Sequence, residues 1–241
     1  MIDVPSMNDL IRKALRPFVP FPVRVWIART VGGRGVRDFA GRFGAGGLSA
    51  YIAWGASARR WHHVQVGPGT QVERGTHFHS NDEGTGKRIV IGERCFVGQN
   101  CFFSAGERIE IRRDSVIGAA CHFLAAGHRY DEPKRSVALA EVISYGPMVL
   151  GANTWIGVGA ILLGGIEIGY GSIVAAGSLL RASVPPLCLV AGNPARVVKT
   201  YDWLAGIWIT LPSEPLEREA TMRRHLQNLP TETAYLDALE T

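Results

Sequence analysis

The sequence has little charge and no concentrated basic tract. Charged residues make up 20% of the 241 positions, and the net charge of +5 comes from basic residues spread along the chain. This distribution favours local anion-binding sites over a nucleic-acid-binding face. Residues 1–16 contain Asp3 and Asp9 and no uninterrupted apolar run, so we expect no signal peptide. With 46% hydrophobic residues the chain is able to bury a substantial core, and we expect one elongated domain with terminal additions.

The hydrophobic pattern of residues 150–180 has neither a helical nor a strand period. Those periods lie near 3.6 and near 2 residues. The aliphatic residues instead recur every six positions, at Leu150, Ile156, Leu162, Ile168, Val174 and Leu180. A hexapeptide period is typical of a parallel β-helix, in which each unit forms one short strand and one corner. The glycines, Glu167 and this period argue against a membrane span over residues 155–180.

The same period extends towards the N-terminus in triplets. Apolar residues stand six apart in three further sets: Val66, Val72 and Phe78; Ile91, Val97 and Phe103; Ile111, Ile117 and Phe123. Three hexapeptides make one turn of a three-sided prism, so the sequence predicts five coils over the fifteen repeat positions. The phase slips only between triplets, which places every insertion at the corner after the third strand of a coil.

A second repeat position lies four residues after each apolar one and is small in twelve of fifteen cases, the exceptions being Asp82, Glu107 and Ile166. Both positions share a face of an extended chain, so both are predicted to point into the prism. Phe78, Phe103 and Phe123 should then stack at about 4.8 Å, the spacing between neighbouring strands. The repeat glycines either relieve crowding at the corners or supply positive φ.

Three of the four cysteines obey this repeat. Cys95, Cys101 and Cys121 occupy the small inward position, so we expect buried core thiols and neither disulfides nor a zinc site. Cys188 lies outside the repeat, and a reduced cytoplasmic protein is the simplest interpretation.

The flanking segments do not repeat. We divide the chain into an N-terminal capping segment (1–60), a β-helix (61–187) with a protruding loop (124–149), and a C-terminal cap with a helical tail (188–241). Helices are predicted over 8–15 and 217–229, and residues 23–30 form an apolar extended or helical segment. The apolar run 203–209 favours a cap or subunit contact, with peripheral membrane association as the alternative.

The largest insertion carries the sequence Gly127-His128-Arg129-Tyr130-Asp131. Histidine is the side chain best suited to accept a proton near neutral pH, and Asp131 could orient the imidazole of His128. A long loop on a rigid scaffold is a common place for a functional residue. The alternative is that His128 is an ordinary solvated loop residue.

A resemblance to a known family rests on five motifs: IGERCFVGQN, LAAGHRYD, LGANTWIGVGA, IGYGSIVAAGSLL and VPPLCLVAGNPARVVK. Over roughly residues 89–200 the chain resembles the hexapeptide-repeat acyltransferases of left-handed parallel β-helix fold, in the branch of the sugar O-acetyltransferases similar to maltose and galactoside acetyltransferases. The resemblance implies acetyl-CoA as co-substrate, a sugar hydroxyl as acceptor, a role in surface polysaccharide biosynthesis, and a cytoplasmic homotrimer with sites between neighbouring prisms. No metal and no nucleic acid are expected.

The resemblance also assigns residues. His128 matches the catalytic base. In the mechanism that this implies, the oxyanion would be stabilised by backbone N–H groups or by Asn100, which is close to the family's active-site Asn but not aligned with it. The positions that match coenzyme contacts are Trp155, Gly157, Val158, Ala176, Arg181, Ala182, Arg196 and Lys199. Three departures from the family pattern are Arg181-Ala182 in place of a Thr-Lys pair, Gly98 in place of an active-site Asn, and Ser183 in place of an acidic residue.

Other functions fit parts of the same pattern. The acceptor could be the amino group of an amino sugar, or serine as in serine O-acetyltransferases, and the acyl group could be longer than acetyl. A zinc-dependent, carbonic-anhydrase-like β-helix protein would draw on His77, His79, His122 and His128. It would leave the coenzyme-side motifs unexplained. A non-catalytic scaffold is the remaining alternative.

Overall fold

A computed structural model describes residues 45–46, 49–81 and 85–240 of this chain. These residues belong to one compact unit. The helix predicted over 8–15, the apolar segment 23–30 and the repeat position Asp82 lie outside the described residues. Among the described helices, none is long and apolar enough to cross a membrane.

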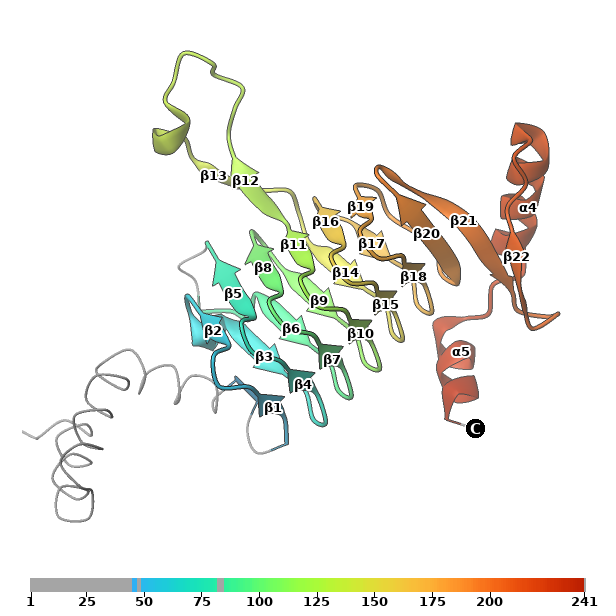
Figure 1. Ribbon diagram of the computed structural model, residues 1–241, viewed down its shortest axis with the longest axis horizontal. Coiled ribbons are helices and arrows are strands. Elements are labelled where there is room, and N and C mark those ends of the chain that lie inside the picture. The colour runs from blue at the N-terminus through green and yellow to red at the C-terminus, as the bar shows by residue number, and fades with distance from the viewer. Residues whose placement is uncertain (1–44, 47–48, 82–84, 241) are drawn as a thin grey trace, which may run out of the picture. The chain divides into compact units, whose positions relative to one another are not determined.

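The described chain winds into a prism with three sheets, which we call faces 1, 2 and 3 (Figure 1). Face 1 holds β1 (Tyr51–Ile52), β4 (Gln71–Val72), β7 (Phe96–Val97), β10 (Val116–Ile117), β15 (Trp155–Ile156), β18 (Ile173–Val174), β20 (Cys188–Gly192), β21 (Ala195–Asp202) and β22 (Ile207–Thr210). Face 2 holds β2 (Ser57–Ala58), β5 (His77–Ser80), β8 (Phe102–Ala105), β11 (His122–Leu124), β16 (Ile161–Leu163) and β19 (Leu179–Leu180). Face 3 holds β3 (Val64–Val66), β6 (Ile89–Ile91), β9 (Ile109–Ile111), β14 (Met148–Leu150) and β17 (Glu167–Ile168).

Neighbouring coils pair in parallel and in the predicted register. On face 2, for example, Phe78 lies opposite Phe103, and Phe103 opposite Phe123. Parallel pairing begins earlier than predicted, because β1 and β2 already pair with β4 and β5. Residues from Tyr51 onwards, assigned from the sequence to a cap ending at residue 60, therefore extend the sheets.

The interior is the one that the six-residue period predicts. All fifteen apolar repeat positions are buried. The ring centroids of Phe78 and Phe103 are 5.1 Å apart and those of Phe103 and Phe123 are 4.5 Å apart, both pairs stacked. The predicted stacking near 4.8 Å is confirmed, and with it the assignment of these three residues to one face.

The small inward residues have a second role that the sequence analysis missed, because most of them donate hydrogen bonds to a carbonyl of the next coil. Thr76 Oγ1 donates to Gly98 O at 3.1 Å, Cys101 Sγ to Gly118 O at 3.2 Å, and Cys121 Sγ to Gly157 O at 3.2 Å. These bonds satisfy corner carbonyls that no strand pairing reaches. The position therefore selects a small side chain with a donor, and the cysteines act there as substitutes for Ser and Thr.

The predicted burial of the cysteines is confirmed, and all four are free thiols. Burial raises the pKa of Cys95, and burial raises the pKa of Cys188 to about 12. Contact with Cys121, together with burial, raises the pKa of Cys101. These thiols stay protonated at neutral pH and do not supply a nucleophile.

The glycines of the repeat are expected either to relieve crowding or to supply positive φ. Gly157 shows the first role. A Cβ at Gly157 would lie 2.4 Å from Ala176 N of the next coil, so only glycine fits there. Positive φ occurs elsewhere, three residues after the apolar repeat positions of faces 1 and 3. Asn100 (φ 58°) and Ala120 (φ 57°) adopt it at the corner between faces 1 and 2, where Gly177 (φ 66°) continues the column.

The insertions lie at the corner between faces 2 and 3, as the phase slips predict. The largest one is a hairpin, which we call the arm: β12 (Ala126–His128) pairs antiparallel with β13 (Val142–Ser144). In Figure 1 the arm extends from the prism beyond the end of β11. Residues 131–139 at its far end are all exposed.

The C-terminal segment covers the last coil. β20 continues face 1 in parallel with β18, and β21 and β22 then pair antiparallel along the same sheet. Helix α4 (Pro215–Gln227) corresponds to the helix predicted over 217–229, and α5 (Glu232–Leu239) follows it. In α4, His225 is buried and its Nε2 lies 2.9 Å from Pro186 O and 3.5 Å from Cys188 Sγ.

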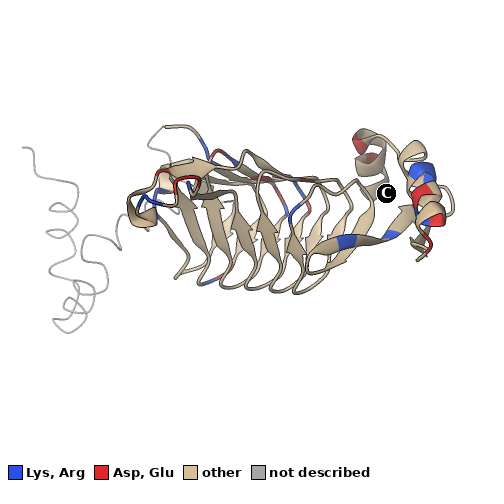
Figure 2. Cartoon of the chain, turned by 90° about the horizontal axis from the view of Figure 1, so that it is seen from above, with Lys and Arg blue, Asp and Glu red and all other residues tan. Residues whose placement is uncertain are grey.

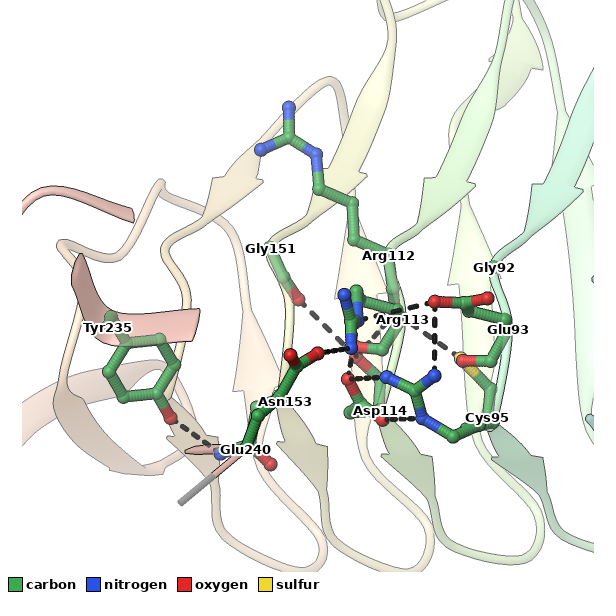
Figure 3. A network of polar contacts seen from close by, with 12 residues as sticks. Gly92, Glu93, Cys95, Arg112, Arg113, Asp114, Gly151, Asn153, Tyr235 and Glu240 are labelled. Carbon is green, nitrogen blue, oxygen red and sulfur yellow. Dashed lines mark hydrogen bonds and ion pairs between the residues drawn. The ribbon is translucent and has the colours of Figure 1, made fainter. Parts of the chain in front are cut away.

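Helix α5 is held against the corner between faces 3 and 1 by a polar network (Figure 3). Arg112 Nη1 donates to Glu232 at 2.8 Å, Arg113 Nη2 donates to Glu240 at 2.6 Å, and Asn153 donates to the Tyr235 hydroxyl at 2.5 Å. These three contacts join α5 to two successive coils.

Within this network Asp114 accepts from Arg94 Nε at 2.7 Å and from Arg113 Nε at 2.8 Å. Burial acts to raise the pKa of Asp114, but these hydrogen bonds outweigh it and lower the pKa below its usual value. The carboxylate is therefore charged throughout the neutral range.

Candidate active site

The arm carries His128 at the end of β12, opposite Val142 of β13. The Arg129 N–H donates to Glu141 O at 2.9 Å, so the hairpin pairing continues past His128. The imidazole is exposed and has no hydrogen-bond partner among the described residues. A histidine held on a paired strand with a free imidazole is available as a proton acceptor.

Asp131 does not orient His128 in this structure. Asp131 is exposed, and no hydrogen bond or ion pair joins it to His128 within the described chain. The hairpin accounts for this, because paired backbone fixes His128 whereas Asp131 lies in the segment between β12 and β13. The expected orienting contact is therefore absent from a single protomer.

Asn100 lies at a different corner from the arm. It follows β7 in the turn between faces 1 and 2, with its side chain exposed and its N–H donating to Arg74 O at 3.1 Å. The arm instead leaves face 2 after β11, at the corner between faces 2 and 3. The strands of face 2 therefore separate Asn100 from His128 in one protomer.

Four of the predicted coenzyme residues gather on face 1 and at the corner between faces 1 and 2. Trp155 is 54% exposed on β15 and pairs with Ile173, so its ring points outwards from face 1. Gly157 and Val158 follow β15, and Ala176 follows β18 in the turn of the next coil. Gly177 N donates to Val158 O at 2.9 Å, which joins the two turns.

The β20–β21 hairpin tip completes this row. Gly192 N donates to Ser178 Oγ at 3.3 Å, which places the tip beside the corner that contains Ala176. Arg196 lies next to the tip and is exposed. Among the described residues its guanidinium hydrogen-bonds only the neighbouring Ala195 O, at 2.9 Å. Lys199 follows on the same strand. The row thus runs from the turn after β15 to two cations on β21.

Arg181 and Ala182 occupy the other corner. They follow β19 and precede Val184, which bridges to Ile168 of face 3. Both are exposed at the corner between faces 2 and 3, from which the arm also leaves, two coils earlier. The predicted site residues are therefore divided between two corners of the prism.

The basic residues at these two corners lack the carboxylate partners that the arginines beside α5 have. Arg94, Arg112 and Arg113 are each paired with carboxylates. Within the described residues no carboxylate pairs with Arg181, Arg196 or Lys199. Figure 2 shows basic positions along β21, on an otherwise sparsely charged sheet. Unpaired cations on a charge-poor surface are suited to bind phosphate groups.

Three of the four histidines proposed as zinc ligands contact other residues on or beside face 2. His77 Nδ1 lies 2.8 Å from Ser57 Oγ, and His79 Nε2 lies 2.7 Å from Asn81 Oδ1. Burial, and to a lesser extent the neighbouring His79, lowers the pKa of His77. His122 packs near Phe102, with ring centroids 6.3 Å apart. Across the part of the chain that the structure describes, no three His, Cys, Asp or Glu side chains meet as a metal site.

A cavity of about 430 Å³ lies beside face 3. It is lined by residues of face 3 and of α5, among them Arg112, Tyr170, Ser183 and Glu232. Arg112 and Glu232 already pair with one another across it. No residue assigned to the candidate site lines this cavity.

Known proteins share this fold and this repeat. A family model described as the hexapeptide repeat of succinyl-transferase matches residues 88–121 and 147–182. Over these residues the chain carries the hexapeptide repeat that the model describes. The matched ranges contain most of the small inward positions and the turns of the coenzyme row, and the resemblance drawn from the motifs is confirmed.

Relatives of this chain are named as acetyltransferases. The Staphylococcus aureus (strain COL) protein SACOL2570 is 35% identical over 138 residues, which are 57% of this chain and 65% of the relative. The match therefore spans less than two thirds of the relative's length. Chloramphenicol acetyltransferase of Klebsiella aerogenes is 37% identical over 98 residues, covering 34% of this chain and 47% of that protein.

Among solved structures, the Bacillus cereus N-acyltransferase AntD, in complex with dTDP and 3-hydroxybutyryl-CoA, superposes with a TM-score of 0.54. Its sequence is 17% identical, and the superposition covers 81% of this chain and 90% of AntD. At this identity the likeness establishes the shared β-helix fold. It supports the expectation of a parallel β-helix with a hexapeptide repeat.

Proposed function

We propose that this protein is an acyltransferase that uses acetyl-CoA to acetylate a sugar hydroxyl. The observation that carries the proposal is the free imidazole of His128, presented on a paired strand of the arm. The relatives named as acetyltransferases, and the acyl-CoA bound to a protein of the same fold, support this reaction class.

In the proposed reaction His128 accepts the proton of the acceptor hydroxyl as its oxygen attacks the thioester carbonyl. The C–O bond forms, the C–S bond of the tetrahedral intermediate breaks, and the protonated imidazole returns its proton to the departing thiolate of coenzyme A. Backbone N–H groups or Asn100 stabilise the oxyanion. No covalent enzyme intermediate is required, because the acceptor oxygen attacks the thioester directly, and all four thiols are buried.

Coenzyme A would lie along the row from Trp155 to Lys199. The exposed indole of Trp155 would contact the pantetheine arm, with Val158 and Ala176 beside it. Arg196 and Lys199 have no carboxylate partner within the described chain and would bind the phosphates as charge-assisted donors. Arg181 would supply the further cation, at the position where the family has a Thr-Lys pair.

A homotrimer would resolve the division of the site between two corners. The arm leaves one corner of the prism, and the coenzyme row lies at another, beyond the width of face 2. In an assembly of parallel prisms, the arm of one protomer would meet the coenzyme row of its neighbour. Each site would then combine His128 from one chain with Trp155 and Arg196 from the next.

The acceptor proposed is a sugar of a surface-polysaccharide precursor, acetylated in the cytoplasm. A panel of free sugars, nucleotide sugars, amino sugars and serine, assayed for release of coenzyme A thiol from acetyl-CoA, tests this class directly. Acceleration by a sugar without an amino group supports O-acetylation. Acceleration confined to amino sugars would contradict it and indicate N-acetylation, and no acceleration by any acceptor would favour a scaffold role.

Sharing of the site between protomers has a separate test. Mixed trimers reassembled from His128→Ala and Arg196→Ala/Lys199→Ala chains would contain some sites with all three wild-type side chains. We expect the mixture to regain turnover at low acetyl-CoA concentration that neither parent shows. A mixture no more active than the average of its parents would contradict shared sites.

A further inference from the structure

The ring of Tyr145 lies directly against Gly127, the residue before His128. A Cβ built at Gly127 would lie 2.0 Å from the Tyr145 hydroxyl oxygen, 2.7 Å from Cζ and 3.1 Å from Cε2. At these distances a methyl group at position 127 would have to displace the phenol, whose side chain is otherwise 44% exposed. The insertion thus pairs a glycine with an aromatic ring one residue from the candidate base.

The backbone that carries this ring is fixed to the prism. Tyr145 N donates to Ala125 O at 3.0 Å, and Tyr145 O accepts from Gly165 N of the following coil at 3.1 Å. The preceding residue, Ser144, packs against Gly106 of the previous coil, where a Cβ would lie 2.7 Å from Ser144 Oγ. The base of the arm is therefore held between two coils.

The ring and the imidazole lie on opposite sides of the hairpin. In the antiparallel register Gly127 faces Ile143 and His128 faces Val142, so alternate residues point to alternate sides. Tyr145 is two residues after Ile143 and therefore shares the side of Gly127. The ring blocks displacement of β12 away from the side on which His128 points.

We propose that Tyr145 is a positioning residue that fixes the backbone of His128 through its ring contact with Gly127. The proposal rests on the proposed role of His128 as the base. The Tyr145 hydroxyl has no hydrogen-bond partner among the described residues, so the support comes from the ring and not from a polar contact. Displacement of a catalytic group by about 1 Å can lower the rate roughly 100-fold, so a contact that prevents a small displacement of His128 has a large effect on kcat.

The test compares Tyr145→Phe, Tyr145→Ala, Gly127→Ala and the double variant Gly127→Ala/Tyr145→Ala. The assay uses acetyl-CoA with the acceptor that the wild-type protein acetylates fastest in the panel. We expect Tyr145→Ala and Gly127→Ala each to lower kcat roughly 10- to 100-fold, with the KM for acetyl-CoA and the melting temperature nearly unchanged. Tyr145→Phe should retain wild-type kcat, because the ring stays in place.

The double variant should be no slower than Tyr145→Ala alone, because the methyl group at position 127 then has space. Such non-additivity is the expected signature of two residues in direct contact. A reduction of kcat in the double variant equal to the product of the two single-variant reductions would overturn the proposal. So would a large rise in the acceptor KM of Tyr145→Phe, which would make the hydroxyl an acceptor contact instead.

Amide hydrogen exchange needs no acceptor and no turnover, so it tests the proposal even if a variant is too unstable to assay. Amide hydrogen exchange of Gly127, His128 and Arg129 should accelerate in Tyr145→Ala and stay at the wild-type rate in Tyr145→Phe. Equal exchange in both variants would overturn the proposal. Failure of the proposed function gives a different result, because His128→Ala would then retain full activity. If His128→Ala instead lowers kcat as the proposed function predicts, the Tyr145 variants alone decide whether Tyr145 positions His128.

Discussion

Replacing Phe103 by leucine tests the packing that the repeat produces. Phe103 is fully buried on face 2 and stacks between two rings, at 5.1 Å from Phe78 and 4.5 Å from Phe123. Leucine keeps most of the apolar volume, so the main loss is the pair of ring contacts. At about 0.5–1.5 kcal/mol for each aromatic pair, Phe103→Leu should lower the free energy of unfolding by about 1–3 kcal/mol.

Phe123→Leu provides the graded comparison, because Phe123 stacks on Phe103 alone and should lose about half as much. Phe96→Leu is the matched control on the outer side of β7, where the ring is 38% exposed and stacks on no ring of the described residues. Thermal unfolding at one fixed protomer concentration measures all three, with about 2–4 °C expected per kcal/mol for a chain of this size. Equal shifts for Phe96→Leu and Phe103→Leu would refute the inward stack.

Three further predictions concern the coenzyme row, the α5 network and the core thiols. Arg196→Ala should raise the KM for acetyl-CoA with kcat less affected, and the difference from wild type should shrink as salt rises in steady-state assays, since phosphate attraction is screened. Asp114 has a lowered pKa, so its ion pairs stabilise the fold above the unfolded pKa near 4 and are lost as pH falls through the lower folded value. Asp114→Asn should therefore cost about 0.2–1 kcal/mol for each lost pair at pH 7 and nothing near pH 2, as urea titrations at the two pH values would show. Cys121→Ser should keep the bond to Gly157 O whereas Cys121→Ala should cost about 1 kcal/mol in urea unfolding, and equal stability of the two would contradict that role.

The sequence predicts the interior well because the period of six is itself a packing constraint. A residue such as Phe103 has to be apolar in every coil, and a residue such as Cys121 has to be small, so the pattern survives in a single sequence. The corner that receives the insertions follows from the same pattern, since only there does the phase slip. What the period leaves out is hydrogen bonding, which is why the donor role of Cys101 and Cys121 appears only in three dimensions.

The candidate site is less predictable for a physical reason. Asp131 looks close to His128 along the chain, but the hairpin fixes His128 and leaves Asp131 in the segment between its two strands. Asn100 and His128 lie at different corners, which no local pattern reveals. Tyr145 stands 18 residues after Gly127 and meets it only because the insertion folds back as a hairpin. The start of the sheets at Tyr51 was missed because β1 and β2 precede the regular repeat.

The most direct test of the central claim is the turnover of His128→Ala beside His122→Ala, with acetyl-CoA and the fastest acceptor of the panel. His122 is the control because it lies on the outer side of β11 in face 2, where its ring packs near Phe102. We predict that His128→Ala lowers kcat by roughly two to four powers of ten with coenzyme binding nearly unchanged, whereas His122→Ala leaves the rate unaltered. Equal loss of activity in the two variants, together with stoichiometric zinc in the purified protein, would contradict the acyltransferase mechanism.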